Sequence, residues 1–400
     1  MTAEFNPFSA ENRFDPYPHY HALRAEDPVH YWPLSQGWVL TRYADVLSVL
    51  RDPRVSADRT RSTMSKILGP PPIAEEFRDT FEAIQSHSML TMDPPDHTRL
   101  RRLVNRSFTP RMVEGLRPRI EQIVAELLDA VGGSSHMDLI RDLAYPLPVT
   151  VIAEMLGVPA DDRVMLKRWS EELLVLTEPF VPIDAALRSA GEMRRYFEGV
   201  CADRRRRPRD DLISGLVAAD EEGDMLTEQE LFAMCVLLLV AGHETTTNLI
   251  GNAVLALLRH PGERRRLQAD PTLMRNAVEE FLRYDSIVQA TARVATEDLE
   301  VGGKTIRPGE FIILVFGAAN RDPAEFPDPD RLDVRRQDIH HVAFGNGIHF
   351  CLGAQLARIE ALIALDAFLR RYPRFEGDYG ELQYKPTALL RGLQSLPLAL

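Results

Sequence analysis

Apolar residues recur at helical spacing along most of this 400-residue chain, so the pattern predicts a mainly helical protein. Residues 29–32 and 37–41 are predicted to be two short strands joined by a turn, and residues 291–315 alternate between apolar and polar positions as strands do. Residues 52–91 follow neither pattern and are expected to be irregular. The fold class is therefore mainly α with small β-sheets (α+β). Further helices are expected at 17–25, 43–50, 119–131, 145–157, 160–176, 183–206, 278–285 and 354–362.

One predicted helix differs from the others because it is apolar on nearly all sides. Thr227 and Glu230 form a capping-box sequence at its start, and the run 231–242 follows without a charged residue. Such a helix is expected to be central and buried, and the run is too short to cross a bilayer. The chain turns abruptly polar at 243–247 before the apolar spacing resumes. Polar residues are unfavourable inside a buried helix, so their clustering at this one place indicates a functional site.

Composition and charge narrow the possible classes of protein. We find no linker, repeat or low-complexity tract, so residues 1–400 are expected to form a single domain. The net charge of −12 argues against nucleic acid as a partner. Three widely spaced cysteines do not make a disulfide framework and fit a reducing cytoplasm. Residues 1–12 lack the apolar core of a secretory signal. We expect a cytoplasmic monomer that does not bind membranes.

A glycine-punctuated loop at 344–353 runs directly into the predicted helix 354–362. Cys351 stands where the loop becomes helix, so a thiolate there would face backbone N–H groups and the positive end of the helix dipole. Glycines let the backbone pass close to a flat group that a Cβ would touch. One thiolate on such a bend suits a haem iron.

Two other interpretations of Cys351 are open. It could be one more buried thiol that acts as a small hydrophobe. It could also join His340, His341 and His349 in a zinc site, although zinc sites usually show paired ligands such as C-x-x-C, which are missing here. Haem is therefore the favoured ligand.

The loop resembles the haem-binding loop of the cytochromes P-450, the haem-thiolate monooxygenases, in their soluble bacterial form. The matching positions of Phe-Gly-x-Gly-x-His-x-Cys-x-Gly are Phe344, Gly345, Gly347, His349, Cys351 and Gly353. The resemblance implies one haem b (iron protoporphyrin IX) sandwiched between the long central helix and the Cys351 helix. It also implies that Cys351 is the axial thiolate on the haem iron.

The stretch Ala241-Gly242-x-Glu244-Thr245 resembles the oxygen-activating segment of the same family. By that resemblance Glu244 and Thr245 are the catalytic acid–alcohol pair. Thr245 would hydrogen-bond the bound dioxygen or its water, and Glu244 would deliver protons from solvent. Thr246 and Thr247 are expected to be helix-wall groups.

His97 and Arg101 lie four residues apart in a helix that opens at 94–96, so they share one face. A solvated basic face would explain them as well. In the family, a His-x-x-x-Arg pair in this place binds the haem propionates, and two cations suit two carboxylates. By placement alone, Arg293 and His349 complete the contacts.

Three further residues resemble a buried structural triad of the family, namely Glu280, Arg283 and Arg331, although an exposed ion pair between the first two would be equally ordinary. The irregular segments 60–90 and 177–183 are expected to act as a lid. Placement relative to the haem motifs also suggests an apolar substrate pocket. Its candidate residues are Leu90, Val240, Ala241, Ile287, Val288, Ala290 and Leu390.

The resemblance implies a monooxygenase of secondary metabolism that inserts one oxygen atom from O2 into an apolar small molecule, by hydroxylation or epoxidation. Electrons would come from NAD(P)H through ferredoxin reductase and ferredoxin, since we find no flavin or nicotinamide fingerprint. Ferredoxin is expected to dock near Arg102, Arg106 and Arg358. A peroxide-driven peroxygenase and a haem gas sensor are the alternatives. The first usually lacks the acid–alcohol pair, and the second needs an output domain that the sequence does not show.

Overall fold

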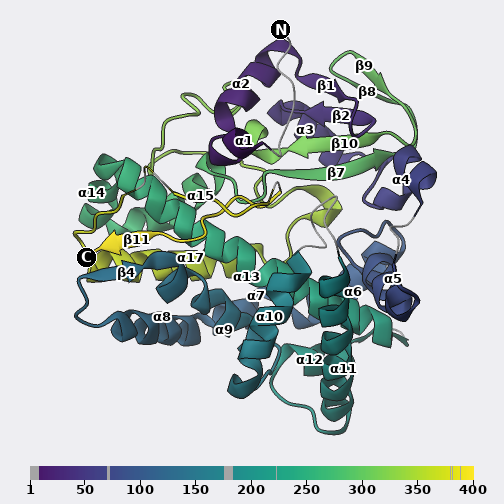
Figure 1. The fold of residues 1–400 in the computed structure, drawn as a ribbon, viewed down its shortest axis with the longest axis horizontal. Helices are drawn as coiled ribbons and strands as arrows, with labels where there is room; N and C mark the ends of the chain where they lie inside the picture. The colour runs from purple at the N-terminus through teal and green to yellow at the C-terminus, as the bar shows by residue number, and fades with distance from the viewer. Residues whose placement is uncertain are drawn as a thin grey trace. The chain divides into compact units, whose positions relative to one another are not determined.

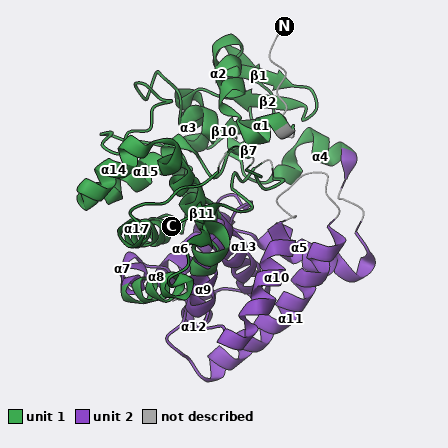
Figure 2. Cartoon of the chain, turned by 60° about the vertical axis from the view of Figure 1, so that its left-hand side comes forward, with its two compact units in different colours: residues 1–67, 118–147, 245–400 green, residues 68–117, 148–244 purple. Residues whose placement is uncertain are grey.

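The computed structural model describes residues 9–69, 73–174, 183–221, 223–378, 380, 382–387 and 389–400. The chain divides into two compact units, shown in different colours in Figure 2. Unit 1 comprises Met1–Ile67, Pro118–Leu147 and Thr245–Leu400, and unit 2 comprises Leu68–Arg117 and Pro148–Glu244. Most of the predicted lid segment 177–183 lies outside the described residues. The single-domain organisation of 1–400 stays a prediction.

Unit 1 contains the strands of the largest sheet and the helices that flank it. Its elements, wholly or mainly, are α1 (Ala10–Phe14), α2 (Tyr17–Glu26), β1 (Val29–Trp32), β2 (Gly37–Leu40), α3 (Tyr43–Arg51), β3 (Val55–Ser56), α4 (Thr63–Leu68), α8 (Arg117–Val131), β4 (His136–Asp138), α14 (Pro261–Ala269), α15 (Met274–Tyr284), β7 (Ala290–Ala295), β8 (Leu299–Val301), β9 (Lys304–Ile306), β10 (Phe311–Val315), α16 (Phe316–Ala319), α17 (Ala354–Arg371) and β11 (Pro397–Ala399).

Unit 2 is almost entirely helical. Its elements, wholly or mainly, are α5 (Arg78–His87), α6 (Asp96–Ser107), α7 (Pro110–Gly115), α9 (Pro146–Met155), α10 (Arg163–Leu173), α11 (Asp184–Arg206), α12 (Leu212–Ala218), β5 (Asp220–Glu221) and β6 (Asp224–Met225). The longest helix, α13 (Glu228–Arg259), contributes residues 228–244 to unit 2 and residues 245–259 to unit 1.

The sheet of unit 1 has the strand order β1-β2-β10-β7-β3 (Figure 1). Strand β10 runs parallel to β2 and antiparallel to β7. Successive side chains point to opposite faces, as strand geometry requires. Leu40 and Leu314 pack in one apolar cluster with residues of α3, and Val39 and Val315 pack in another with residues of α2. The sheet is therefore covered on both faces at these strands, which explains why β10 is apolar at every position.

Helix α13 begins with the predicted capping box. The backbone N–H of Thr227 donates to Glu230 Oε2 at 2.8 Å, and the N–H of Glu230 donates to Thr227 Oγ1 at 3.2 Å. Arg99 of α6 donates to the same carboxylate. Among the described helices, α13 alone has the length and hydropathy that a membrane span would need, yet 72% of its most apolar window is buried inside the protein. It is a core helix.

The predicted class, mainly α with small sheets, is confirmed. The irregular segment predicted at 52–91 is wrong, because it contains β3, α4 and α5. In α5 only Thr80 and Ala83 are buried, and in α4 no residue is buried. Both helices are short, of six and ten residues, so each offers too few turns for the apolar spacing to be recognised in the sequence.

Candidate functional site

The loop before α17 presents Cys351 at the surface of unit 1. The backbone N–H of Cys351 donates to the carbonyl of Phe344 at 3.0 Å, which closes the loop on itself. The thiol is exposed, and α17 begins three residues later. A sulfur in this position is accessible to a ligand and lies near the positive end of a helix dipole.

Gly347 and Gly353 of the loop differ in what would require a glycine at each position. A Cβ on Gly347, whose φ is +70°, would come within 2.5 Å of the Leu50 carbonyl oxygen in α3. That glycine is required by the protein itself. A Cβ on Gly353 would meet nothing within 4 Å, and its φ of −83° suits any residue. Neither protein packing nor backbone conformation explains Gly353, but a flat group lying against the Cys351 loop would need the space. These features fit a haem.

The interpretation of Cys351 as a buried thiol does not agree with its exposure. The other two cysteines do behave in that way: burial raises the pKa of Cys201 to about 11 and raises the pKa of Cys235 well above the usual range. Cys351 is the cysteine whose sulfur is open to a ligand.

The zinc alternative finds no support in the geometry. The ring of His341 donates from Nε2 to Glu279 at 3.1 Å and accepts at Nδ1 from the N–H of Ala343 at 3.3 Å, so both ring nitrogens are occupied. Arg358 adds two hydrogen bonds to Glu279, of 2.7 and 2.9 Å. Burial alone would raise the pKa of Glu279, but these partners lower it to about 2. Within the described part of the chain, no three His, Cys, Asp or Glu side chains are grouped to hold a metal ion.

A buried ion pair lies in α15. Arg283 donates to both oxygens of Glu280 at 2.7 and 2.8 Å, and neither side chain is exposed. The second cation on Glu280 is Arg336, at 3.2 Å, which takes the place predicted for Arg331. The guanidinium of Arg331 is 64% exposed and binds Asp333, while its carbonyl accepts from Arg283. In the irregular segment that contains both arginines, Arg331 contributes its backbone carbonyl and Arg336 contributes its side chain. No local sequence pattern shows which of the two side chains reaches Glu280.

The polar stretch of α13 is open on one side only. Ala241 is exposed and Thr245 half-buried; being four residues apart, they share one face of the helix. Glu244 is 4% exposed and His243 is fully buried. Gly242 lets α9 approach, since a Cβ there would lie 3.2 Å from Ile152 Cδ1. The open face of α13 therefore carries Thr245, the alcohol of the predicted acid–alcohol pair. Glu244, the acid, is the preceding residue in the chain.

The four predicted propionate ligands fall into two pairs. In unit 2, His97 is 2% exposed and Arg101 is half-buried on the same face of α6. In unit 1, Arg293 on β7 is 8% exposed and donates to its neighbour's carbonyl, that of Ala292, at 2.9 Å, and His349 is half-buried beside Cys351. All four are thus at least partly shielded from solvent, unlike a purely solvated basic face.

Part of the predicted substrate pocket comes together within unit 1. Val288 forms an antiparallel bridge with Leu390, and the N–H of Arg391 donates to the Ile287 carbonyl at 2.7 Å. Ala290 begins β7 on the same segment. In unit 2, Leu90 is 54% exposed, and Val240 and Ala241 are partly open residues of α13. The candidate pocket residues are therefore at least partly accessible rather than part of the core, except Ile287, which is buried.

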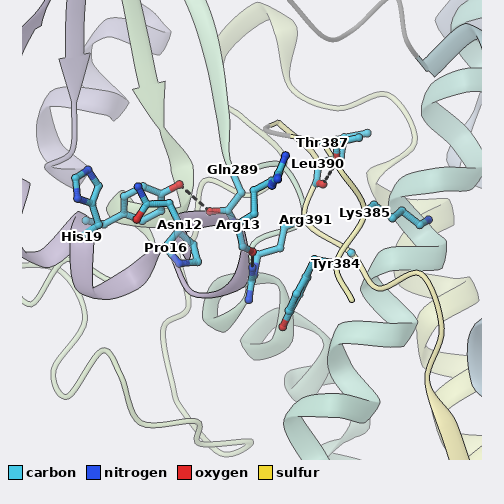
Figure 3. A pocket seen from close by; sticks show the side chains of 12 residues that line it. Asn12, Arg13, Pro16, His19, Gln289, Tyr384, Lys385, Thr387, Leu390 and Arg391 are labelled. Carbon is cyan, nitrogen blue, oxygen red and sulfur yellow. Dashed lines mark hydrogen bonds between the residues drawn. The ribbon is translucent and has the colours of Figure 1, made fainter. Parts of the chain in front are cut away.

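A small pocket lies in unit 1, with Gln289, Leu390 and Arg391 among the residues that line it (Figure 3). Its volume of about 20 Å³ leaves room for roughly one water molecule, so it cannot hold an apolar substrate. Arg391 in its wall donates to Asp285 at 2.7 Å and to the carbonyls of Arg13 and Phe14. Sequence reasoning missed this network because its members are far apart in the chain.

Comparison with known proteins gives consistent matches. The family model described as Cytochrome P450 matches residues 73–383. The chain is 45% identical to Vitamin D(3) 25-hydroxylase of Pseudonocardia autotrophica over 405 residues, covering 100% of this chain and 97% of that protein. It is 44% identical to Cytochrome P450 monooxygenase PikC of Streptomyces venezuelae, covering 96% and 91%. The solved structure of P450BioI with an acyl carrier protein that carries hexadec-9Z-enoic acid aligns with a TM-score of 0.90 and 40% identity, covering 98% and 100%.

Proposed function

The chain belongs to the cytochrome P450 family of bacterial monooxygenases, and from this premise we propose that it inserts one oxygen atom from O2 into a bulky apolar molecule, by hydroxylation or epoxidation. The observation that carries the proposal is the exposed thiol of Cys351 at the start of α17, with open space at Gly353 beside it. When bound there, a haem with a thiolate ligand would supply the activation of O2.

The residues that would hold the haem are those whose chemistry matches its parts. Cys351 provides the thiolate for the iron. His97, Arg101, Arg293 and His349 provide positive charge and N–H donors for the two propionates, and charge-assisted hydrogen bonds of this kind are among the strongest in proteins.

The proton-handling groups belong to α13. We assign the Thr245 hydroxyl, on the open face of the helix, to hydrogen-bond and protonate the reacting oxygen. We assign the buried Glu244 to bring protons to Thr245 from solvent. This pair favours an O2-dependent reaction over a peroxide-driven one. The partly open residues Val240, Ala241, Val288, Ala290, Leu390 and Leu90, with Ile287, would keep water away and contact the substrate.

The electrons would come from NAD(P)H through a ferredoxin reductase and a ferredoxin. Arg102 and Arg106, both exposed and four residues apart on α6, are the proposed docking cations for an acidic ferredoxin. Arg358 is less suited than expected, because its guanidinium binds Glu279 and lies 4.5 Å from the centre of the Phe344 ring. Its role would be to support the loop.

Two relatives support a proposal for the substrate class. One similar protein is named for the hydroxylation of vitamin D3, and one similar structure contains a fatty acid attached to a carrier protein. Both molecules are long and apolar, so we propose an apolar substrate of secondary metabolism. We also propose that the enzyme is cytoplasmic.

The deciding experiment is optical. Purified protein should bind haem, and its reduced carbon-monoxide adduct should show the thiolate signature. Cys351→Ser should lose that signature, whereas Cys201→Ser should keep it because Cys201 is buried. A folded protein that is colourless, or whose adduct lacks the signature, would overturn the proposal. If the thiolate signature is present, a ligand screen that follows the Soret band identifies substrates.

A further inference from the structure

A buried histidine precedes the proposed relay acid on α13. His243 is fully buried, and its Nδ1 lies 2.8 Å from the Leu239 carbonyl oxygen one turn earlier. Its Nε2 lies 3.4 Å from Ser170 Oγ on α10 and 3.9 Å from Glu244 Oε2. All four residues belong to unit 2. The proposed function leaves this histidine without a task.

The hydrogen-bond partners determine how many protons the ring carries. A carbonyl oxygen only accepts, so Nδ1 carries a proton. The hydroxyl of Ser170 has one proton, which it donates to the Lys167 carbonyl at 2.8 Å. With that proton engaged, Ser170 Oγ is free to accept from His243, and a proton on Nε2 would satisfy both this contact and the one with Glu244. A ring with two N–H donors is an imidazolium, and the Glu244 carboxylate is the counter-charge that such a buried cation needs.

The charged groups named here on α9 and α10 have recorded partners of their own. On α10, Lys167 and Glu171 form an exposed ion pair at 3.9 Å, and Glu172 accepts from Ser189 of α11. On α9, Glu154 pairs with Arg163 at 3.0 Å. Glu244 is thus the carboxylate that the structure records within ion-pair distance of the buried ring.

We propose that His243 is a positioning residue for Glu244: its buried imidazolium pairs with the carboxylate and holds it turned toward Nε2 until a proton arrives from solvent. This inference rests on the proposed role of Glu244 as a proton relay. Ser170 has the complementary role, because it accepts from Nε2 and so favours the doubly protonated ring.

The test is ¹⁵N NMR of histidine-labelled holoenzyme as the diamagnetic reduced carbon-monoxide complex, with His243→Gln used to assign the signal. Ring-nitrogen shifts distinguish imidazolium from neutral imidazole. At pH 7 we expect His243 to be doubly protonated, to become neutral in Glu244→Gln, and to stay charged in Glu244→Asp. A neutral ring in the unaltered protein, or a charged ring in Glu244→Gln, would overturn the inference. Ser170→Ala should also shift the ring toward the neutral form, without removing a charge.

His260 is the matched control. Its Nδ1 lies 2.9 Å from the Ala256 carbonyl one turn earlier, the same ring-to-backbone bond, but the nearest recorded ring partner is Tyr284, at 5.5 Å between centroids. Its signal should be the same in all variants. A signal that moves together with that of His243 would mean a global change of structure and would overturn the assignment of the effect to Glu244.

Turnover separates this inference from the proposed function. His243→Gln should lower coupled product formation about tenfold, less than the roughly hundredfold or larger loss expected when the relay acid itself is replaced in Glu244→Gln. If the NMR shows a charged ring that depends on Glu244 while Glu244→Gln keeps full turnover, the pairing stands and the relay is wrong. Equal losses in both variants would overturn the purely positioning role of His243.

Discussion

Arg283 binds Glu280 through two hydrogen bonds of 2.7 and 2.8 Å, and both side chains are completely buried. Arg283 also donates to the carbonyls of Asn320, at 3.0 Å, and Pro329, at 2.8 Å. The pair therefore joins α15 to the irregular chain that precedes the Cys351 loop. Removing one partner of a buried ion pair lowers stability strongly, because the remaining charge stays buried without compensation.

Replacing Arg283 by Ala should destabilise the protein by about 3–5 kcal/mol, because Glu280 would remain buried without its main partner. Arg336→Ala should cost less, since that side chain is partly exposed and makes one bond to Glu280. Arg331→Ala is the control and should cost about 1 kcal/mol or less, as expected for an exposed ion pair. Denaturant unfolding measures all three. A larger loss for Arg331 than for Arg336 would restore the triad predicted from sequence.

Glu360 on α17 should make stability depend on pH. Burial raises its pKa to about 8, and the hydroxyl of Thr246 offsets only part of that rise. The folded protein thus holds a proton that the unfolded chain releases near pH 4–5. The stabilisation is complete below the pKa of the unfolded chain and is lost as the pH rises through about 8.

The slope for this one group is at most about 1.4 kcal/mol per pH unit. Glu360→Gln should therefore gain stability relative to the unaltered protein as the pH rises from about 5 to about 8, as measured by melting temperatures at each pH. A difference between the two proteins that stays constant over this range would show that Glu360 is ionised in the fold.

Thr245→Ala should uncouple NAD(P)H consumption from product formation, because the alcohol that protonates the reacting oxygen is removed. Peroxide should be released in place of product, while the Cys351 thiolate signature is unchanged. Thr245→Ser keeps a hydroxyl and should restore most of the coupling. Product formed one for one with NAD(P)H in the Ala variant would count against the assignment.

Charge reversal of Arg102 and Arg106 on α6 should slow electron delivery by ferredoxin, by about tenfold at low salt and less at high salt. Substrate binding, followed by the Soret shift, should not change. Arg370→Glu on α17 serves as control, because that arginine is also exposed and its recorded ion pair is with Asp366, one turn earlier on the same helix. An unaffected reduction rate would place the docking face elsewhere.

The sequence predicted those parts of the protein whose signals are local. The capping box of α13, the start of α17 and the alternating strands each depend on residues within a few positions of one another, and all appear where expected. The fold class followed from the same periodicities.

The errors share a physical cause, which is dependence on distant or weak contacts. Helices α4 and α5 are short and bury few residues, so their apolar spacing extends over only one to three turns. Arg336 reaches Glu280 across 56 positions, so nothing near either residue marks the contact. The bond between Tyr17 and Asp285, at 2.7 Å, spans 268 positions and is equally invisible.

Arg391 connects the two ends of the described chain. Its guanidinium donates to the carbonyls of Arg13, at 2.5 Å, and Phe14, at 2.9 Å, as well as to Asp285. These acceptors are backbone atoms, so substituting either amino acid would leave the bonds in place, whereas deleting the peptide would remove them. Any shortened version of the enzyme for crystallisation or for fusion to a reductase should therefore keep residues 13 and 14.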